Sequence, residues 1–187
     1  DEGEKISILT GTLARHDRQA PNYGRGYNDF NTFYIQAASS TSGGSSGSPV
    51  LNQDGEVVAL NAGGSTRGAS SFYLPLDRVV RALDDLQNDR EITRGTLQTI
   101  FKYTPFDEVR RLGLNSETEG LVRETFEDGT GMLVVSHVLP QGPADGILQV
   151  GDIVTHVDGE LVTTFIPLEV ILDESVDSEV NFTVERG

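Results

Sequence analysis

The stretch Gly43-Gly44-Ser45-Ser46-Gly47-Ser48-Pro49-Val50 decides how the rest of this 187-residue sequence is interpreted. It lies between an apolar run that ends at Ala38 and a strand-like run that begins at Pro49, so it is no long linker. Glycines two residues before and one residue after Ser46 allow the backbone to direct two N–H groups at one point. An oxyanion needs that arrangement beside a nucleophilic hydroxyl. Two interpretations remain open, a nucleophile loop and an ordinary flexible Gly/Ser loop.

Short apolar runs on both sides of this stretch predict β-strands separated by clusters of Gly, Ser, Asn and Asp. The runs comprise residues 6–10, 33–36, 49–51, 56–60 and 72–74. Asp54-Gly55, between two of them, predicts a two-residue type I′ turn, because that turn requires positive φ. The pattern is typical of an antiparallel barrel or sandwich. Residues 77–87 change to a helical period, with an apolar stripe of Val79, Val80, Leu83 and Leu86.

The second half of the sequence predicts a mixed β/α unit. Its expected strands are residues 96–101, 132–139 and 180–184, with a hairpin over 153–162 that turns at Asp158-Gly159. Thr104 and Pro105 predict the N-cap and first residue of a helix that stops at Gly113. Another helix is expected over 165–172, capped by Thr164. The predicted fold class is mostly β with short helices, arranged as a unit 1–88, a linker 89–93 and a unit 94–187.

Composition and charge exclude several classes of function. The sequence has 29 acidic and 14 basic side chains, a formal net charge of −15, which argues against nucleic acid and anionic membranes as partners. It has no cysteine and therefore no disulfide, thiol nucleophile or cysteine-bound metal. Glu124, Glu127 and Asp128 match no EF-hand spacing, so neither a metal site nor a cofactor is predicted. The acidic stretches Asp84-Asp85 and 173–179 are interpreted as solvated faces.

The first half resembles the nucleophile-bearing barrel of a chymotrypsin-fold serine protease, specifically of the HtrA (Deg) family. Gly43–Val50, Gly55–Asn61 and Phe72–Pro75 carry the resemblance. It implies a serine endopeptidase with Ser46 as nucleophile and the N–H groups of Gly44 and Ser46 as oxyanion hole. The usual family loop has Asn directly before the serine and Gly two residues after it, where this sequence has Ser45 and Ser48.

The same resemblance implies a pocket for the side chain that precedes the cleaved bond. Its expected lining is Ser40, Thr41, Ser42, Asn61, Ala62, Phe72 and Tyr73. No carboxylate is among these residues, so a basic side chain would be buried there without a partner. We therefore expect cleavage after small or medium apolar residues.

The second half resembles a circularly permuted PDZ domain of the HtrA type. The matching motifs are Arg94-Gly95-Thr96-Leu97, Val138-Leu139-Pro140, Gly142-Pro143-Ala144 and Val150–Val154. The resemblance implies that peptide C-termini add as a strand along residues 98–101, opposite the helix 165–172. The terminal carboxylate would lie in a nest formed by Gly95, Thr96 and Leu97. The last side chain would enter a pocket lined by Leu97, Phe101 and Leu168.

A serine protease of this fold also needs a histidine and an aspartate, which precede the serine in the chain. The histidine lies about 140 residues before the serine, but only 45 residues precede Ser46 here. His16, His137 and His156 each stand in a context unlike that of the catalytic histidine. The chain is therefore expected to be a fragment, a second protease barrel with a first PDZ domain, and to be inactive alone.

Two functions from different classes remain open. The first is a serine endopeptidase with protein substrates, which could assemble as a homo-oligomer at full length. The alternative is a degenerate protease half that acts only as a peptide-binding adaptor. Asn28–Thr32 and the variant serine loop resemble a fungal nuclear branch of the HtrA family, with tandem repeats and a link to apoptosis. That branch implies the nucleus as the location, with the cytoplasm as a second one.

Overall fold

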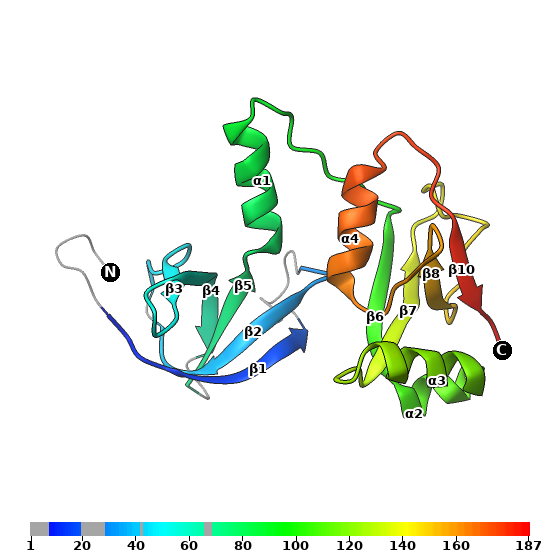
Figure 1. Ribbon diagram of the computed structural model, residues 1–187, viewed down its shortest axis with the longest axis horizontal. Helices are drawn as coiled ribbons and strands as arrows, with labels where there is room; N and C mark the ends of the chain where they lie inside the picture. Colours follow the sequence, from blue (N-terminus) through cyan, green and yellow to red (C-terminus); the bar gives the residue numbers. More distant parts are fainter. Residues whose placement is uncertain (1–7, 20–28, 42, 66–68) are drawn as a thin grey trace. The chain divides into compact units, whose positions relative to one another are not determined.

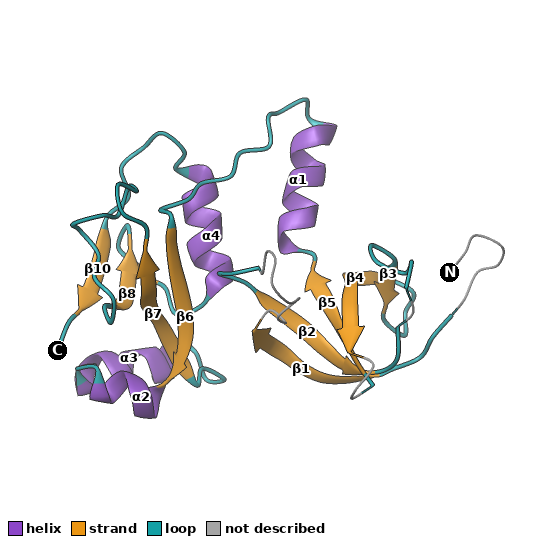
Figure 2. Ribbon diagram, turned by 180° about the vertical axis from the view of Figure 1, so that it is seen from behind, coloured by secondary structure: helices purple, strands orange, loops and turns teal. Residues whose placement is uncertain are grey.

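The computed structural model describes residues 8–19, 29–41, 43–65 and 69–187. The chain divides into two compact units, Asp1–Ile92 and Thr93–Gly187. Each unit is built on its own antiparallel sheet, so the prediction of a mostly β fold with short helices is confirmed (Figures 1 and 2).

The first unit is one five-stranded antiparallel sheet in the order β1-β2-β5-β4-β3. A buried group on neighbouring strands forms its core and comprises Tyr34, Ala37, Ala59 and Phe72. A helix follows the sheet and spans the predicted residues. The elements are β1 Thr12–Gln19, β2 Phe33–Ala38, β3 Pro49–Leu51, β4 Val57–Ser65, β5 Ser70–Pro75 and α1 Asp77–Gln87.

Two local predictions for this unit are wrong. Residues 8–11 are not in a strand, and residues 6–7 lie outside the described residues. The first strand begins only at Thr12 because its partner β2 ends at Ala38, with which Thr12 pairs. Asp54-Gly55 is no two-residue turn either, because only Gly55 of the two has positive φ (82°). The side-chain Oδ1 of Asn52 accepts the N–H groups of Asp54 and Glu56, both at 2.9 Å, and so closes a longer loop.

The second unit is a four-stranded antiparallel sheet in the order β10-β8-β7-β6, with β9 paired to β8. Helices α2 and α3 share one buried cluster with the sheet, which contains Phe106, Val109, Leu114, Val122, Met132, Val134 and Ile153. The elements are β6 Thr99–Pro105, α2 Phe106–Arg111, α3 Ser116–Thr125, β7 Gly131–Val138, β8 Ile153–Val157, β9 Glu160–Leu161, α4 Phe165–Glu174 and β10 Phe182–Glu185.

In this unit, the predicted hairpin turn is correct and the predicted helix cap at Thr104 is not. Asp158 and Gly159 both have positive φ, 47° and 86°, so the predicted hairpin turn is confirmed. The predicted cap at Thr104 is wrong, because Thr104 pairs with Met132 as part of β6 and the helix begins after Pro105.

The cap of α4 is only partly as predicted, and one helix is not predicted at all. Thr164 is the N-cap residue of α4 but makes no side-chain capping bond. Helix α3 is missed, although Asn115 caps it by accepting the N–H of Glu117 at 2.8 Å. An Asn before an acidic first turn is a readable helix start.

Candidate active site and peptide-binding edge

The Gly/Ser loop joins β2 to β3 and is a tight, anchored turn. Gly44 and Gly47 adopt positive φ, 90° and 81°, which glycine allows without strain. The N–H of Gly47 donates to the carbonyl of Asn61 at 2.7 Å, and the N–H of Asn61 donates to the carbonyl of Ser48 at 2.8 Å. These bonds fasten the loop to β4, so the interpretation as an unanchored flexible loop does not hold.

Asn61 holds the loop from the side of the sheet. Its side chain is buried, and its Nδ2 donates to the hydroxyl of Thr41 and to both the carbonyl and the hydroxyl of Ser45, each at 2.9 Å. The hydroxyls of Thr41 and Ser45 lie 2.6 Å apart. Ser45 therefore points into this network, while its neighbour Ser46 is exposed. The serine that replaces the family's Asn thus has a structural role.

The oxyanion-hole donors expected from the resemblance are available. In the part of the chain that the structure describes, the N–H groups of Gly44 and Ser46 donate no hydrogen bond. Ser48 does not take a positive φ, because Gly47 supplies the turn, so its β-carbon causes no backbone strain. Among the described residues, the loop thus has an exposed hydroxyl at Ser46 and two backbone N–H groups for which no acceptor is present.

The structure brings three of the expected pocket residues together. Asn61 pairs with Tyr73 across β4 and β5, so both side chains lie on one face of the sheet. Thr41 reaches the same face, because a β-carbon on Gly64 would lie 2.4 Å from the Thr41 methyl. The hydroxyl of Tyr73 is 2.8 Å from that of Ser39.

The remaining pocket predictions have different outcomes. Phe72 follows the opposite face of β5 from Tyr73 and is buried in the core, so its side chain does not join this pocket. Ala62 lies at the bulge between Asn61 and Gly63, and Ser40 is exposed. Ser42 lies outside the described residues.

No histidine of the first unit is placed as a general base for Ser46. His16 is exposed on β1, the edge strand farthest from β3 in the sheet order. His137 and His156 belong to the second unit, where their Nδ1 atoms contact the hydroxyls of Ser136 and Thr155 at 2.9 and 3.1 Å. All three histidines are described, and none of their hydrogen bonds involves Ser46.

In the second unit, β6 is the edge of the sheet and α4 lies beside it (Figures 1 and 2). Two of the three residues predicted to line the peptide pocket are buried. Phe101 is 3% exposed and stacks on Phe182 with ring centroids 6.4 Å apart, and Leu168 is fully buried. Leu97 is half-buried at the entry to the edge. Phe101 and Leu168 therefore pack in the core of this unit, and their assignment to the peptide pocket stays a prediction.

The predicted carboxylate nest is already partly occupied. The N–H of Gly95 donates to Oδ1 of Asp173 at 3.0 Å, so it is not available to a peptide. A β-carbon on Gly95 would lie 1.8 Å from the carbonyl oxygen of Leu172, which explains the glycine by close packing on α4. The N–H groups of Thr96 and Leu97 have no acceptor among the described residues. Asp173, interpreted from the sequence as part of a solvated stretch, is in fact 3% exposed.

Among the described residues, no three His, Cys, Asp or Glu side chains form a group that could hold a metal ion. No helix within the described ranges has both the length and the apolar character needed to cross a membrane.

Each unit contains a segment that is similar to a known protein domain. A trypsin-like peptidase domain model matches residues 1–60 and a PDZ domain model matches residues 134–186. Over its whole length the chain is 55% identical to the pro-apoptotic serine protease NMA111 of Ajellomyces capsulatus and 54% identical to that of Candida glabrata. Over its whole length the chain is thus similar to a section of these serine proteases.

Solved HtrA-type structures show the same fold at lower identity. The HtrA-type protease AlgW with tripeptide matches all of this chain and 58% of its own length, with a TM-score of 0.62 and 20% identity. AlgW with decapeptide gives a TM-score of 0.52 at 19% identity, over 97% of this chain and 55% of its own. The chain spans only 18% and 19% of the length of the two fungal relatives, so it corresponds to one section of such proteins.

Proposed function

We propose that this chain is the nucleophile-bearing section of a serine endopeptidase of the HtrA type, with Ser46 as the nucleophile. The observation that carries the proposal is the anchored loop, in which Ser46 is exposed while Ser45 is tied to Asn61. The identity to proteins named serine proteases supports it.

The proposed step uses the loop as a preformed acceptor of negative charge. The Ser46 oxygen attacks the substrate carbonyl carbon, and the carbonyl oxygen becomes an oxyanion held by the N–H groups of Gly44 and Ser46. The serine proton passes to a histidine, which then donates it to the leaving amine. Because none of the three described histidines is hydrogen-bonded to Ser46, we propose that this histidine and its aspartate lie in the longer protein.

The pocket that we propose is lined by fewer residues than the sequence alone indicated. Thr41, Asn61 and Tyr73 share the face beside the loop and carry no negative charge at neutral pH. A lysine or arginine side chain would be desolvated there without a counter-ion. We therefore propose preference for small or medium apolar residues before the cut.

For the second unit we propose capture of extended peptides along the outer edge of β6, the last strand of its sheet. Strand addition satisfies the edge backbone, and the N–H groups of Thr96 and Leu97 can receive a terminal carboxylate. The two AlgW structures with peptides support peptide binding as a property of related proteins. A nuclear location and homo-oligomerisation at full length remain part of the proposal on the resemblance alone.

The test of the nucleophile compares two serines of one loop. In the full-length protein we expect Ser46→Ala to lower turnover by at least about 10³-fold, because the members of a triad act as a unit. Ser48→Ala, at an exposed serine two residues away, is the matched control and should retain turnover. Cleavage of a peptide library by wild type and both variants gives the measurement.

Fluorophosphonate labelling of the 187-residue chain and of the full-length protein distinguishes the protease function from the adaptor function. We expect no labelling of Ser46 in this chain, because no histidine activates it, and labelling in the full-length protein. Full activity of the Ser46→Ala protein would show that this section is not the one that cleaves peptides, and would favour the adaptor function for it. A full-length protein that is not labelled at Ser46 would favour the same function. The observation that supports the adaptor is that no histidine is hydrogen-bonded to Ser46 in this chain.

A further inference from the structure

The side chain of Asn61 fixes the direction of one of the two backbone donors in the proposed oxyanion hole. Its Nδ2 donates to the carbonyl oxygen of Ser45 at 2.9 Å, and the N–H of Ser48 donates to the same oxygen at 3.1 Å. This carbonyl and the N–H of Ser46 belong to one peptide group. Because a trans peptide is planar, its C=O and N–H point in opposite directions. The N–H of Ser46 therefore points away from Asn61, and it meets no acceptor among the described residues.

The direction of the Asn61 amide is determined by its partners. The Ser45 carbonyl can only accept a hydrogen bond, so the amide must present Nδ2 to it and not Oδ1. The opposite atom, Oδ1, is buried and has no hydrogen-bond partner among the described residues. Because an unpaired buried acceptor lowers stability, folding alone gives asparagine little advantage here over an apolar side chain of the same shape.

The anchoring of the loop to β4 does not depend on this amide. The N–H of Gly47 donates to the carbonyl of Asn61, and the N–H of Asn61 donates to the carbonyl of Ser48, through backbone atoms that any residue supplies. The partners of Nδ2 also keep other bonds without it. The hydroxyls of Thr41 and Ser45 lie 2.6 Å apart, and the Ser45 carbonyl still accepts the N–H of Ser48. Loss of the amide therefore leaves the loop in place with one bond fewer on the Ser45 carbonyl.

From these contacts we propose that Asn61 is a positioning residue for the reaction, a buried amide that keeps the N–H of Ser46 directed at the developing oxyanion. This inference rests on the proposed endopeptidase function with Ser46 as nucleophile. A donor that is already in place stabilises the oxyanion without reorganising during the reaction. The bond from Nδ2 also polarises the shared peptide group, which strengthens its N–H as a donor. Asn61 thus acts on the transition state through this peptide group.

The experiment replaces Asn61 by leucine, which has a similar shape and no polar atom, in the full-length protein. Because the oxyanion forms only in the transition state, we expect kcat to fall by about 10- to 100-fold while KM stays within about twofold of wild type. The loss is smaller than the roughly 10²- to 10³-fold cost of deleting an oxyanion donor, because the N–H of Ser46 remains and only its direction is freed. A peptide boronic acid, whose tetrahedral adduct resembles the transition state, should lose affinity by the same factor as kcat/KM.

Two controls separate positioning from folding. The melting temperature of the 187-residue chain should shift by less than about 5 °C in Asn61→Leu, because the unpaired Oδ1 is removed together with Nδ2. Asn52→Leu is the matched control and should leave kcat unchanged. Asn52 also holds a loop of the same unit through its side chain, which accepts the N–H groups of Asp54 and Glu56, but it makes no bond to the nucleophile loop.

Asn61→Val, a smaller apolar side chain that favours a strand, provides a second variant if Asn61→Leu fails to fold. A folded variant of either kind with wild-type kcat overturns the inference. A rise in KM at unchanged kcat does the same, because it shows that Asn61 serves substrate binding and not the transition state. Undiminished turnover of Ser46→Ala would instead remove the proposed nucleophile itself.

Discussion

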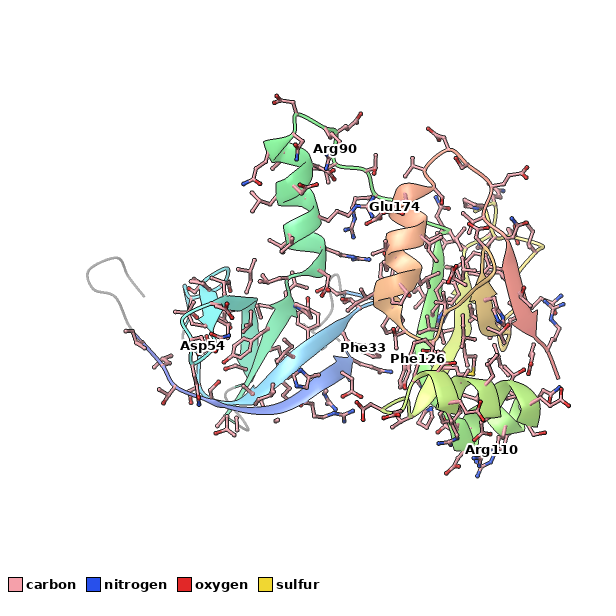
Figure 3. All side chains as sticks on the ribbon, in the orientation of Figure 1. Phe33, Asp54, Arg90, Arg110, Phe126 and Glu174 are labelled. Carbon is pink, nitrogen blue, oxygen red and sulfur yellow. The ribbon has the colours of Figure 1, made fainter. Side chains whose placement is uncertain are left out.

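Glu119 of the second unit forms ion pairs with two arginines. Its carboxylate accepts two bonds of 2.7 Å from Arg110 and one of 2.8 Å from Arg123, and Arg123 also lies over the Phe106 ring at 4.1 Å. Arg110 projects from α2 in Figure 3. Hydrogen bonding to Arg110, followed by Arg123, outweighs desolvation and lowers the pKa of Glu119 to about 2. The group links α2 to α3 through an ionised carboxylate.

This pKa predicts a pH dependence of stability with a definite sign. The folded pKa of about 2 lies below the ordinary value of 4.5, so the stabilisation is fully present above pH 4.5 and is lost as pH falls towards 2. We expect Glu119→Gln to lower the free energy of unfolding at pH 7 by on the order of 2 kcal/mol, with both arginines half-exposed. Urea unfolding at pH 7 and pH 2.5 measures the difference, which should shrink at the lower pH. Glu124→Gln, exposed on the same helix, is the control.

At the scale of elements, α1 shows that a helix can form where the sequence predicts it without being buried. The apolar stripe predicts the helix, and α1 spans the predicted residues. Yet Val80, Leu83 and Leu86 are 55%, 51% and 62% exposed, and no residue of α1 is buried. A helical period thus indicates which face of a helix is apolar, but it does not show that this face is buried.

The exposed stripe predicts a small effect of substitution. We expect Leu83→Gln to change the free energy of unfolding by less than about 0.5 kcal/mol, because Leu83 buries little and Gln has a similar helix propensity. Phe72→Ala, in the core of the same unit, should cost about 3 kcal/mol. Urea unfolding of both variants measures the contrast. A loss at Leu83 comparable to that at Phe72 would show that its side chain is covered.

At the scale of the whole molecule, the chain consists of two units with separate cores. The division falls between Ile92 and Thr93, after a segment in which Arg90 is bonded to Asp84 and Asp85 of α1. Each unit therefore has its own sheet and its own buried cluster, as independent cooperative units require.

This division predicts two thermal transitions in calorimetry. Phe72→Ala should lower the midpoint of one transition and Glu119→Gln that of the other, because each substitution acts on one core. The double variant should show both shifts added, as expected for distant sites. A single transition that both substitutions move would contradict the independence of the units.

The sequence by itself determined what depends on neighbouring residues. The glycines that permit the turn at Ser46, the Asp158-Gly159 hairpin and the limits of α1 all follow from backbone preference or periodicity, which act over a few positions. Even the missed helix α3 carried a local signal in Asn115.

The tertiary structure alone decided which distant groups meet. Asn61 reaches Ser45 from another strand, Asp173 reaches Gly95 across 78 positions, and Phe101 stacks on Phe182 of β10. Such pairings depend on strand register and close packing, which fix the environment of a side chain from outside its own segment. An acidic residue at the end of a helix is therefore solvated or buried according to its tertiary neighbours, and for Asp173 these neighbours are the residues of the proposed peptide site.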